Sequence, residues 1–146
     1  MQQIQSEIEI TATPLRVWRV LTDFSAYPTW NPFVRSISGE QALGARLTVT
    51  IQPVGGKPMS FKPTLLAFEP EKELRWKGQL LMPGMFDGEH YFQLAEASAG
   101  IVRFAQGEVF SGVLVPLVFR GSVRVGTERG FAAMNQALKA RAEAPQ

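Results

Sequence analysis

The sequence predicts an α+β fold in which seven antiparallel strands pack against one long C-terminal helix. Three observations carry this prediction: strand-type alternation at the N-terminus, a run of short β segments through the middle, and helical periodicity near the C-terminus. A sheet with its helices kept to one face forms two layers, and this pairing leaves a space between them. The 146 residues fit a single domain, residues 1–146, that builds its core without disulfides.

The first strand and two short helices are expected before residue 33. Residues 3–11 alternate, with isoleucines and a serine on one side and glutamine or glutamate on the other, which is typical of a half-buried strand. Thr13 is a candidate N-cap before Pro14, and apolar residues then recur at helical spacing up to about Asp23. In the stretch YPTWNPF, residues 27–33, two prolines disfavour helical backbone at the residues before them. At most one short helical turn fits there.

The middle of the chain predicts six further strands. Glycine, proline and serine turns separate segments with β character. The segments lie near residues 33–39, 45–52, 60–69, 72–79, 85–96 and 101–111. Short connections between consecutive strands favour an antiparallel meander.

The last third of the chain predicts one long helix, roughly Val115 to Ala142, because apolar residues recur in steps of three and four. Gly121, Gly126 and Gly130 fall inside it, and each costs about 1 kcal/mol relative to alanine in a helix interior. Two interpretations remain open. The glycines permit close approach of the helix to the sheet, or they mark a bend that lets the first turns move and open a cavity.

Composition excludes several classes of site. The chain has no cysteine and one histidine, so thiolate and multi-histidine metal sites are excluded. Its 15 basic and 13 acidic residues are spread along the chain, without the basic stripe of a nucleic-acid-binding protein. There is no glycine-rich phosphate loop and no apolar run long enough to span a membrane. We expect no secretory signal, because the first residues have neither a basic start nor an apolar run. We expect a cytoplasmic protein without metal, cofactor or nucleic-acid partner, as a monomer or weak homodimer.

Strand alternation selects candidate site residues on the inward faces of the last two strands. Phe86, His90 and Phe92 share one such face. The inward residues of the final strand include Phe104, Gln106, Glu108 and Phe110. If the turn near residues 97–100 joins the strands as a hairpin, His90 falls roughly opposite Gln106 and close to Glu108. A small polar cluster inside an aromatic wall is therefore expected.

The roles of His90 and Glu108 stay open at this point. His90 is a core histidine satisfied by a neighbour, a ligand hydrogen-bonder, or a general acid/base, because histidine titrates near neutral pH. An inward carboxylate at Glu108 must be paired, hydrogen-bonded or protonated. Its partner is His90, Arg120 or Arg124, or else the carboxylate faces a ligand.

The order of these features resembles the START-like superfamily of helix-grip proteins, also called the SRPBCC group. The resemblance covers about Ile4 to Glu143. The residues that carry it are Thr13-Pro14, Val17-Trp18, Leu21-Thr22-Asp23, Tyr27 to Phe33, Leu74-Arg75-Trp76, Gly88-Glu89-His90, Glu108 to Gly112, Gly130-Phe131, Met134-Asn135 and Leu138-Lys139. It implies a curved seven-stranded sheet wrapped on the long helix, two short helices between the first two strands, and an elongated, mostly apolar cavity.

We interpret the chain as a binding protein for a small hydrophobic or aromatic molecule, lipid-like or polyketide-like, held between sheet and helix. The wall on the sheet side would consist of Phe86, His90, Phe92, Phe104, Gln106, Glu108 and Phe110. The residues expected to close the cavity are Trp30, Trp76, Phe119, Val123 and Phe131. One alternative is an aromatase/cyclase- or dehydratase-type enzyme in which His90 or Glu108 moves protons. A second alternative is a protein-interaction module. Pockets for drug-sized ligands begin at about 300 Å³, so we expect at least that volume.

Overall fold

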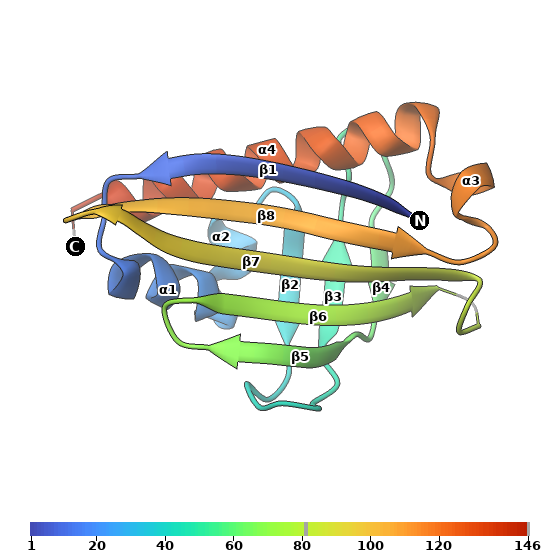
Figure 1. Cartoon of the computed structure of the whole chain (residues 1–146), viewed down its shortest axis with the longest axis horizontal. Helices are drawn as coiled ribbons and strands as arrows, with labels where there is room; N and C mark the ends of the chain where they lie inside the picture. The colour runs from blue at the N-terminus through green and yellow to red at the C-terminus, as the bar shows by residue number, and fades with distance from the viewer. Residues whose placement is uncertain (81, 146) are drawn as a thin grey trace.

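The computed structural model describes residues 1–80 and 82–145 and has an α+β architecture with a curved antiparallel sheet and a long C-terminal helix (Figure 1). The larger sheet has five strands in the order β1 (Gln2–Ile10), β8 (Ile101–Ser111), β7 (Phe86–Ser98), β6 (Glu73–Leu80) and β5 (Thr64–Glu69). The smaller sheet has β2 (Val34–Ser38), β3 (Thr48–Ile51) and β4 (Met59–Phe61). The helices are α1 (Pro14–Thr22), a 3-10 turn (Phe24–Ala26), α2 (Tyr27–Trp30), α3 (Val115–Val118) and α4 (Gly121–Glu143).

All helices and the smaller sheet lie on one side of the five-stranded sheet, and the core fills the space between (Figure 1). The helix α4 runs along β1 and β8, while β2, β3 and β4 cross behind the larger sheet in this view. Each sheet therefore contributes one inward face to a common core, as in packed two-layer folds.

The predictions for the first strand and helix are confirmed. Along β1, Ile4 and Ile10 are buried while the glutamates between them are exposed. Thr13 caps α1 by accepting a hydrogen bond from the amide of Arg16 at 3.1 Å. Pro14 then opens the helix, because its missing N–H would be unpaired in the first turn anyway.

The stretch 27–33 is mainly structural. Tyr27 is fully buried, and its hydroxyl donates to the carbonyl of Leu21. Burial raises the pKa of that hydroxyl well above its usual range, and nearby Asp23 adds to the effect. The Asn31 side chain accepts from the amides of Phe33 and Val34, both at 2.9 Å. The chain therefore turns from α2 into β2 around a buried amide.

The predicted seven-stranded sheet is wrong in one respect: within residues 1–80 and 82–145 the strands number eight and divide into sheets of five and three. The segment expected at 60–69 breaks between Phe61 and Thr64, at Lys62 and Pro63. Proline has no N–H to donate to a ladder, and it interrupts an internal strand. The break turns the chain from the smaller sheet into the larger one.

The predicted helix Val115 to Ala142 is also wrong at its start, since it is divided into α3 and α4. Arg120 is extended, and Gly121 has a φ of +57°, which lies in the left-handed region. A right-handed helix cannot continue through such a residue without interruption. The break turns the ring of Phe119 inward, where it is 1% exposed.

The two glycines inside α4 serve close approach rather than bending. A side chain at Gly130 would collide with the ring of Phe33, which packs on the helix there. At Gly126, a Cβ would lie 2.6 Å from the carbonyl oxygen of Val54, whose amide donates to the Gly126 carbonyl at 3.1 Å. Phe33, just before β2, and the β3–β4 loop therefore pack directly on the helix backbone.

Among the residues that the structure describes, no helix has both the length and the apolar character needed to cross a membrane.

Candidate functional site

A cavity of about 210 Å³ lies at the α3 end of the space between sheet and helices. Strands β3, β4, β6, β7 and β8 line it together with α3 and the start of α4. The apolar part of the lining includes Ile51, Phe61, Phe86, Phe110, Phe119 and Val123. Its volume is below the roughly 300 Å³ expected from the sequence and suits a ligand of one or two rings.

The cavity opens between the β3–β4 loop and α3. Met59, Val118 and Val123 all line it, yet they are 42%, 44% and 45% exposed. Side chains that face both the cavity and solvent mark its mouth. The break between α3 and α4 places two of these residues there, so the helix interruption shapes the entrance.

Glu108 is the carboxylate of the cavity. Its Oε1 atom lies 3.1 Å from Nδ1 of His90, and its Oε2 atom lies over Gly88, where any side chain would collide with it. Gly88 also lines the cavity. The Glu108 side chain is 16% exposed. A glycine on β7 therefore makes room for a carboxylate from β8 inside a mostly apolar pocket.

His90 joins that carboxylate to a chain of buried amides. Its Nε2 atom lies 2.9 Å from Oε1 of Gln106, whose Nε2 donates to Oδ1 of Asn135 at 2.8 Å. Asn135 in turn donates to Oγ of Ser6 at 3.1 Å. The chain crosses β8, β7, α4 and β1, and Gln106, His90 and Asn135 are each at most 3% exposed. Because these buried side chains hydrogen-bond to one another, the core can hold several polar groups without the cost of leaving them unpaired.

Aromatic rings hold the His90 ring on several sides. Trp76 stacks on it at 5.2 Å, Phe131 lies at 5.0 Å and Phe92 at 4.7 Å between ring centroids. Packing therefore fixes the ring plane, and hydrogen bonds fix both nitrogens. Ring packing and hydrogen bonding together therefore determine the orientation of His90 toward Glu108.

The expected polar cluster is present, with a shifted register. His90 pairs with Glu108 across the β7–β8 ladder, and Gln106 pairs with Phe92 instead. The partner of Glu108 is His90; Arg124 pairs with Glu128 and Gln2, and Arg120 is exposed.

The predicted site residues separate into three groups. Five of them line the cavity: Phe86, Glu108, Phe110, Phe119 and Val123. His90 and Gln106 lie behind Glu108 in the amide chain. The other predicted wall and closing residues fill the core or its edge: Trp30, Trp76, Phe92, Phe104 and Phe131. Trp30 packs edge-on against Tyr27 at 5.2 Å, in α2, and does not line the cavity.

Sequence reasoning missed three residues of this site. Asn135 interrupts the apolar stripe of the last helix next to Met134, and Ser6 interrupts the isoleucines of the first strand. A polar residue on an apolar face was the available signal in both cases. Gly88 gave a weaker signal, since glycine within a strand often marks close approach of another group.

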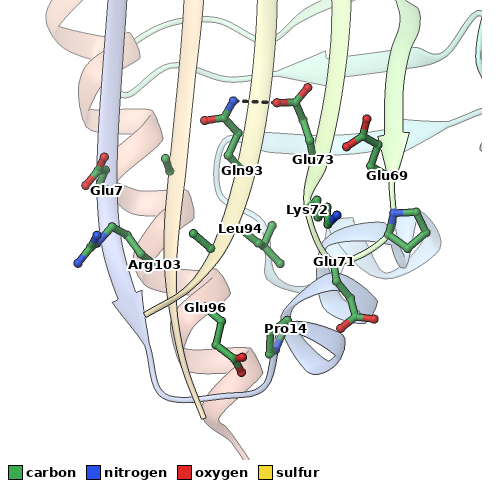
Figure 2. Close-up of a pocket in the computed structure, with 13 residues that line it drawn as sticks. Glu7, Pro14, Glu69, Glu71, Lys72, Glu73, Gln93, Leu94, Glu96 and Arg103 are labelled. Atoms are coloured by element: carbon green, nitrogen blue, oxygen red, sulfur yellow. Dashed lines mark hydrogen bonds between the residues drawn. The ribbon is translucent and has the colours of Figure 1, made fainter. Parts of the chain in front are cut away.

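A larger hollow of about 820 Å³ lies on the outer face of the five-stranded sheet and extends from β1 across β8 and β7 to the β5–β6 turn (Figure 2). Glutamates dominate its lining, and Gln93 donates to Glu73 at 2.7 Å within it. Burial by itself raises the pKa of Glu73, but hydrogen bonds from Arg75 and Gln93 outweigh this and hold the pKa below its usual range. The hollow is open and charged, and most of its glutamates are exposed to solvent, where a carboxylate needs no ligand to be stable.

In the described part of the chain, no group of three or more potential metal ligands converges. The only imidazole of the chain is committed to Glu108 and Gln106.

The sequence profile of one protein family matches residues 1–143 of this chain. The family is described as polyketide cyclase / dehydrase and lipid transport. The chain belongs to this family. It is accordingly a member of the START-like, or SRPBCC, superfamily, in agreement with the curved sheet and long C-terminal helix.

Solved structures share the fold of this START-like chain over nearly its whole length. The Zhui aromatase/cyclase from Streptomyces sp. R1128 has a TM-score of 0.78 at 16% identity, covering 97% of this chain and 93% of that chain. A START superfamily protein from Mycobacterium smegmatis has a TM-score of 0.74 at 17% identity, covering 97% of both chains. Protein MLL2253 from Mesorhizobium loti has a TM-score of 0.68 at 20% identity, covering 96% of both. At these identities the likeness shows the fold and no common ligand or reaction. The search of curated proteins found no match.

Proposed function

We propose that this START-like domain binds a small hydrophobic or aromatic molecule in the cavity between its sheet and the α3–α4 segment. The observation that carries the proposal is an apolar cavity, open at one end, with one carboxylate on its wall. Apolar contact supplies affinity in such pockets, and a few placed polar groups supply orientation. A volume of about 210 Å³ favours a compact aromatic molecule over a long-chain lipid.

Titration with naphthalene, followed by the amide resonances of the protein in NMR spectra, tests the proposal. Binding should shift the resonances of cavity residues such as Gly88 and Thr127. Mass spectrometry of an organic extract of the purified protein complements the titration by detecting a bound molecule carried from the cell. Shifts spread over the outer face alone would contradict the proposal.

A cavity-filling variant gives the matched control. Thr127 lines the cavity, is 7% exposed, and donates only to the Val123 carbonyl one helical turn earlier. Thr127→Leu adds volume inside the cavity and should weaken naphthalene binding by about tenfold or more without lowering stability. Val125→Leu adds volume to a half-exposed residue of the same helix that does not line the cavity. That control should leave naphthalene affinity unchanged.

A second candidate is a cyclase- or dehydratase-type enzyme, favoured by the carboxyl–imidazole pair of Glu108 and His90 at the cavity wall. A carboxyl group bonded to an imidazole is a suitable general acid or base for a ligand that reaches it. Glu108→Gln and His90→Gln should each lower the rate of cyclisation or dehydration of a short poly-β-keto thioester by roughly 10²-fold or more. Unchanged turnover in both variants would leave binding as the function.

A further inference from the structure

The Oε2 atom of Glu108 is the inner polar contact that the cavity offers to a ligand. We propose that it acts as a fixed hydrogen-bond acceptor, so that the cavity selects apolar molecules carrying a hydroxyl or N–H donor and rejects carboxylates. This inference rests on the proposed function of the cavity as a ligand site. It adds the chemical class of the ligand, which the cavity volume alone does not specify.

Hydrogen-bond accounting along the buried chain determines the role of Oε2. The oxygen of Gln106 faces His90, so Nε2 of the imidazole carries a hydrogen and donates it. Nδ1 then faces Oε1 of Glu108 at 3.1 Å, and one proton lies between these two atoms. If the proton is on His90, Oε1 accepts it; if it is on Glu108, Oε1 carries it and donates. In both states Oε2 has lone pairs and no hydrogen.

Reversing the amides gives the same result. If the Gln106 and Asn135 side chains turn by half a rotation, Nε2 of His90 accepts a hydrogen bond and Nδ1 carries the ring hydrogen. That hydrogen again points at Oε1 of Glu108. The hydroxyl of Ser6 at the end of the chain serves as acceptor in one arrangement and donor in the other. The acceptor character of Oε2 therefore follows from the connectivity, whichever way the amides point.

The surroundings leave Oε2 available to a ligand. The atom lies over Gly88 at the cavity wall, and the described residues give it no hydrogen-bond partner. Neither of the other polar side chains of the lining offers a buried donor to a ligand carboxylate: the Thr127 hydroxyl donates its hydrogen to a helix carbonyl at 2.8 Å, and Gln79 is exposed. A ligand hydroxyl would satisfy Oε2 inside an otherwise apolar space. A ligand carboxylate would bring lone pairs against lone pairs and lose its own hydration without a donor in return.

Three naphthalene derivatives of one shape test the inference at pH 7: naphthalene, 2-naphthol and 2-naphthoate, each titrated against the wild-type protein by NMR. We expect 2-naphthol to bind roughly tenfold more tightly than naphthalene, because it gains a hydrogen bond to a strong acceptor. We expect 2-naphthoate to bind at least about tenfold more weakly than naphthalene. Equal affinities for naphthalene and 2-naphthol, or tight binding of 2-naphthoate, would overturn the inference while leaving the cavity as a ligand site. Failure of all three to bind would overturn the proposed function itself, and this inference with it.

The variant Glu108→Gln tests whether the carboxylate of Glu108 is responsible for the selection among the three ligands. An amide at this position can keep a hydrogen bond to His90 and present either its oxygen or its NH₂ group to the cavity. The preference for 2-naphthol should therefore shrink severalfold, and the rejection of 2-naphthoate should weaken by about tenfold. Glu96→Gln, at an exposed position on the same strand as His90, should leave all three affinities unchanged. If Glu108→Gln, folded as judged by its NMR spectrum, keeps the wild-type order and ratios, the acceptor is not Oε2.

Discussion

The two ends of the space between the larger sheet and α4 are built from the same strands but are filled differently. Toward α1, the rings of Trp76, Phe92 and Phe104 fill the space together with Phe131, Met134 and Leu138 of α4, each at most 1% exposed. Toward α3, the same strands β7 and β8 leave a cavity of about 210 Å³.

Two features of the chain account for the hollow end. Gly78 and Gly88 face each other across β6 and β7 and add no side-chain volume there. The break at Gly121 then carries α3 away from the line of α4. The difference teaches that one interface can be tightly packed at one end and hollow at the other, with the His90–Glu108 pair between the two ends.

The largest expected effect comes from removing a ring at the filled end. Phe92 is fully buried and packs against Trp76 at 5.3 Å. Phe92→Ala should lower the free energy of unfolding by about 3–5 kcal/mol, measured by urea denaturation. Phe86→Ala removes the same ring on the same face of the same strand, at the partly exposed cavity wall. Its loss should be about 1–2 kcal/mol, and a loss equal to that of Phe92→Ala would contradict the distinction between the two ends.

Breaking the buried amide chain between the two ends should have the next largest effect. Asn135→Leu leaves Nε2 of Gln106 without an acceptor in a residue that is fully buried. The free energy of unfolding should fall by about 1–3 kcal/mol. Gln136→Leu changes the exposed neighbour on the same helix and should alter stability by less than about 0.5 kcal/mol. In a double-mutant cycle, Gln106→Leu should cost less in the Asn135→Leu background than alone.

The close approach at Gly130 predicts a smaller effect with an informative sign. Helix propensity alone would make Gly130→Ala stabilising by about 1 kcal/mol. The added methyl collides with the ring of Phe33, which is 1% exposed, so we expect a net loss of about 1–2 kcal/mol. At exposed Ala132 on the same helix, Ala132→Gly should destabilise by about 1 kcal/mol. Thermal unfolding of both variants measures the contrast, and a stabilised Gly130→Ala protein would show that the helix is not held tightly at this point.

The smallest effect belongs to the outer face, away from both ends. The folded-state pKa of Glu73 lies below that of the unfolded chain, which is about 4.3. Glu73 therefore contributes stability above about pH 4.3, and this contribution is lost as the pH falls through the lower folded pKa. In urea denaturation at a series of pH values, the gap between wild type and Glu73→Gln should stay below about 1 kcal/mol above pH 5. It should close on acidification, and a gap that widens at low pH would reverse the sign of the linkage.

The sequence by itself determined the elements whose pattern is local. Alternation along the first strand and the Thr13 cap before Pro14 specify β1 and α1, because each depends on neighbours a few residues away. Period-two alternation also placed His90, Gln106 and Glu108 on inward faces. The predicted hairpin placed His90 opposite Gln106, two residues from its actual partner Glu108. The sequence positions of glycine and proline did not predict where elements would break. Pro63 divides a segment predicted as one strand, and Gly121 divides a segment predicted as one helix.

Only the tertiary structure decided where the cavity lies and which buried polar side chains form hydrogen bonds with each other. The partner of Gln106 is Asn135, 29 residues later, and the partner of Asn135 is Ser6, 129 residues earlier. Whether a ring such as Phe92 lines a cavity or fills one depends on the volumes of every facing side chain and on how closely the backbones approach. Those volumes come from distant parts of the chain, so packing at this level has no signature in any single stretch of sequence.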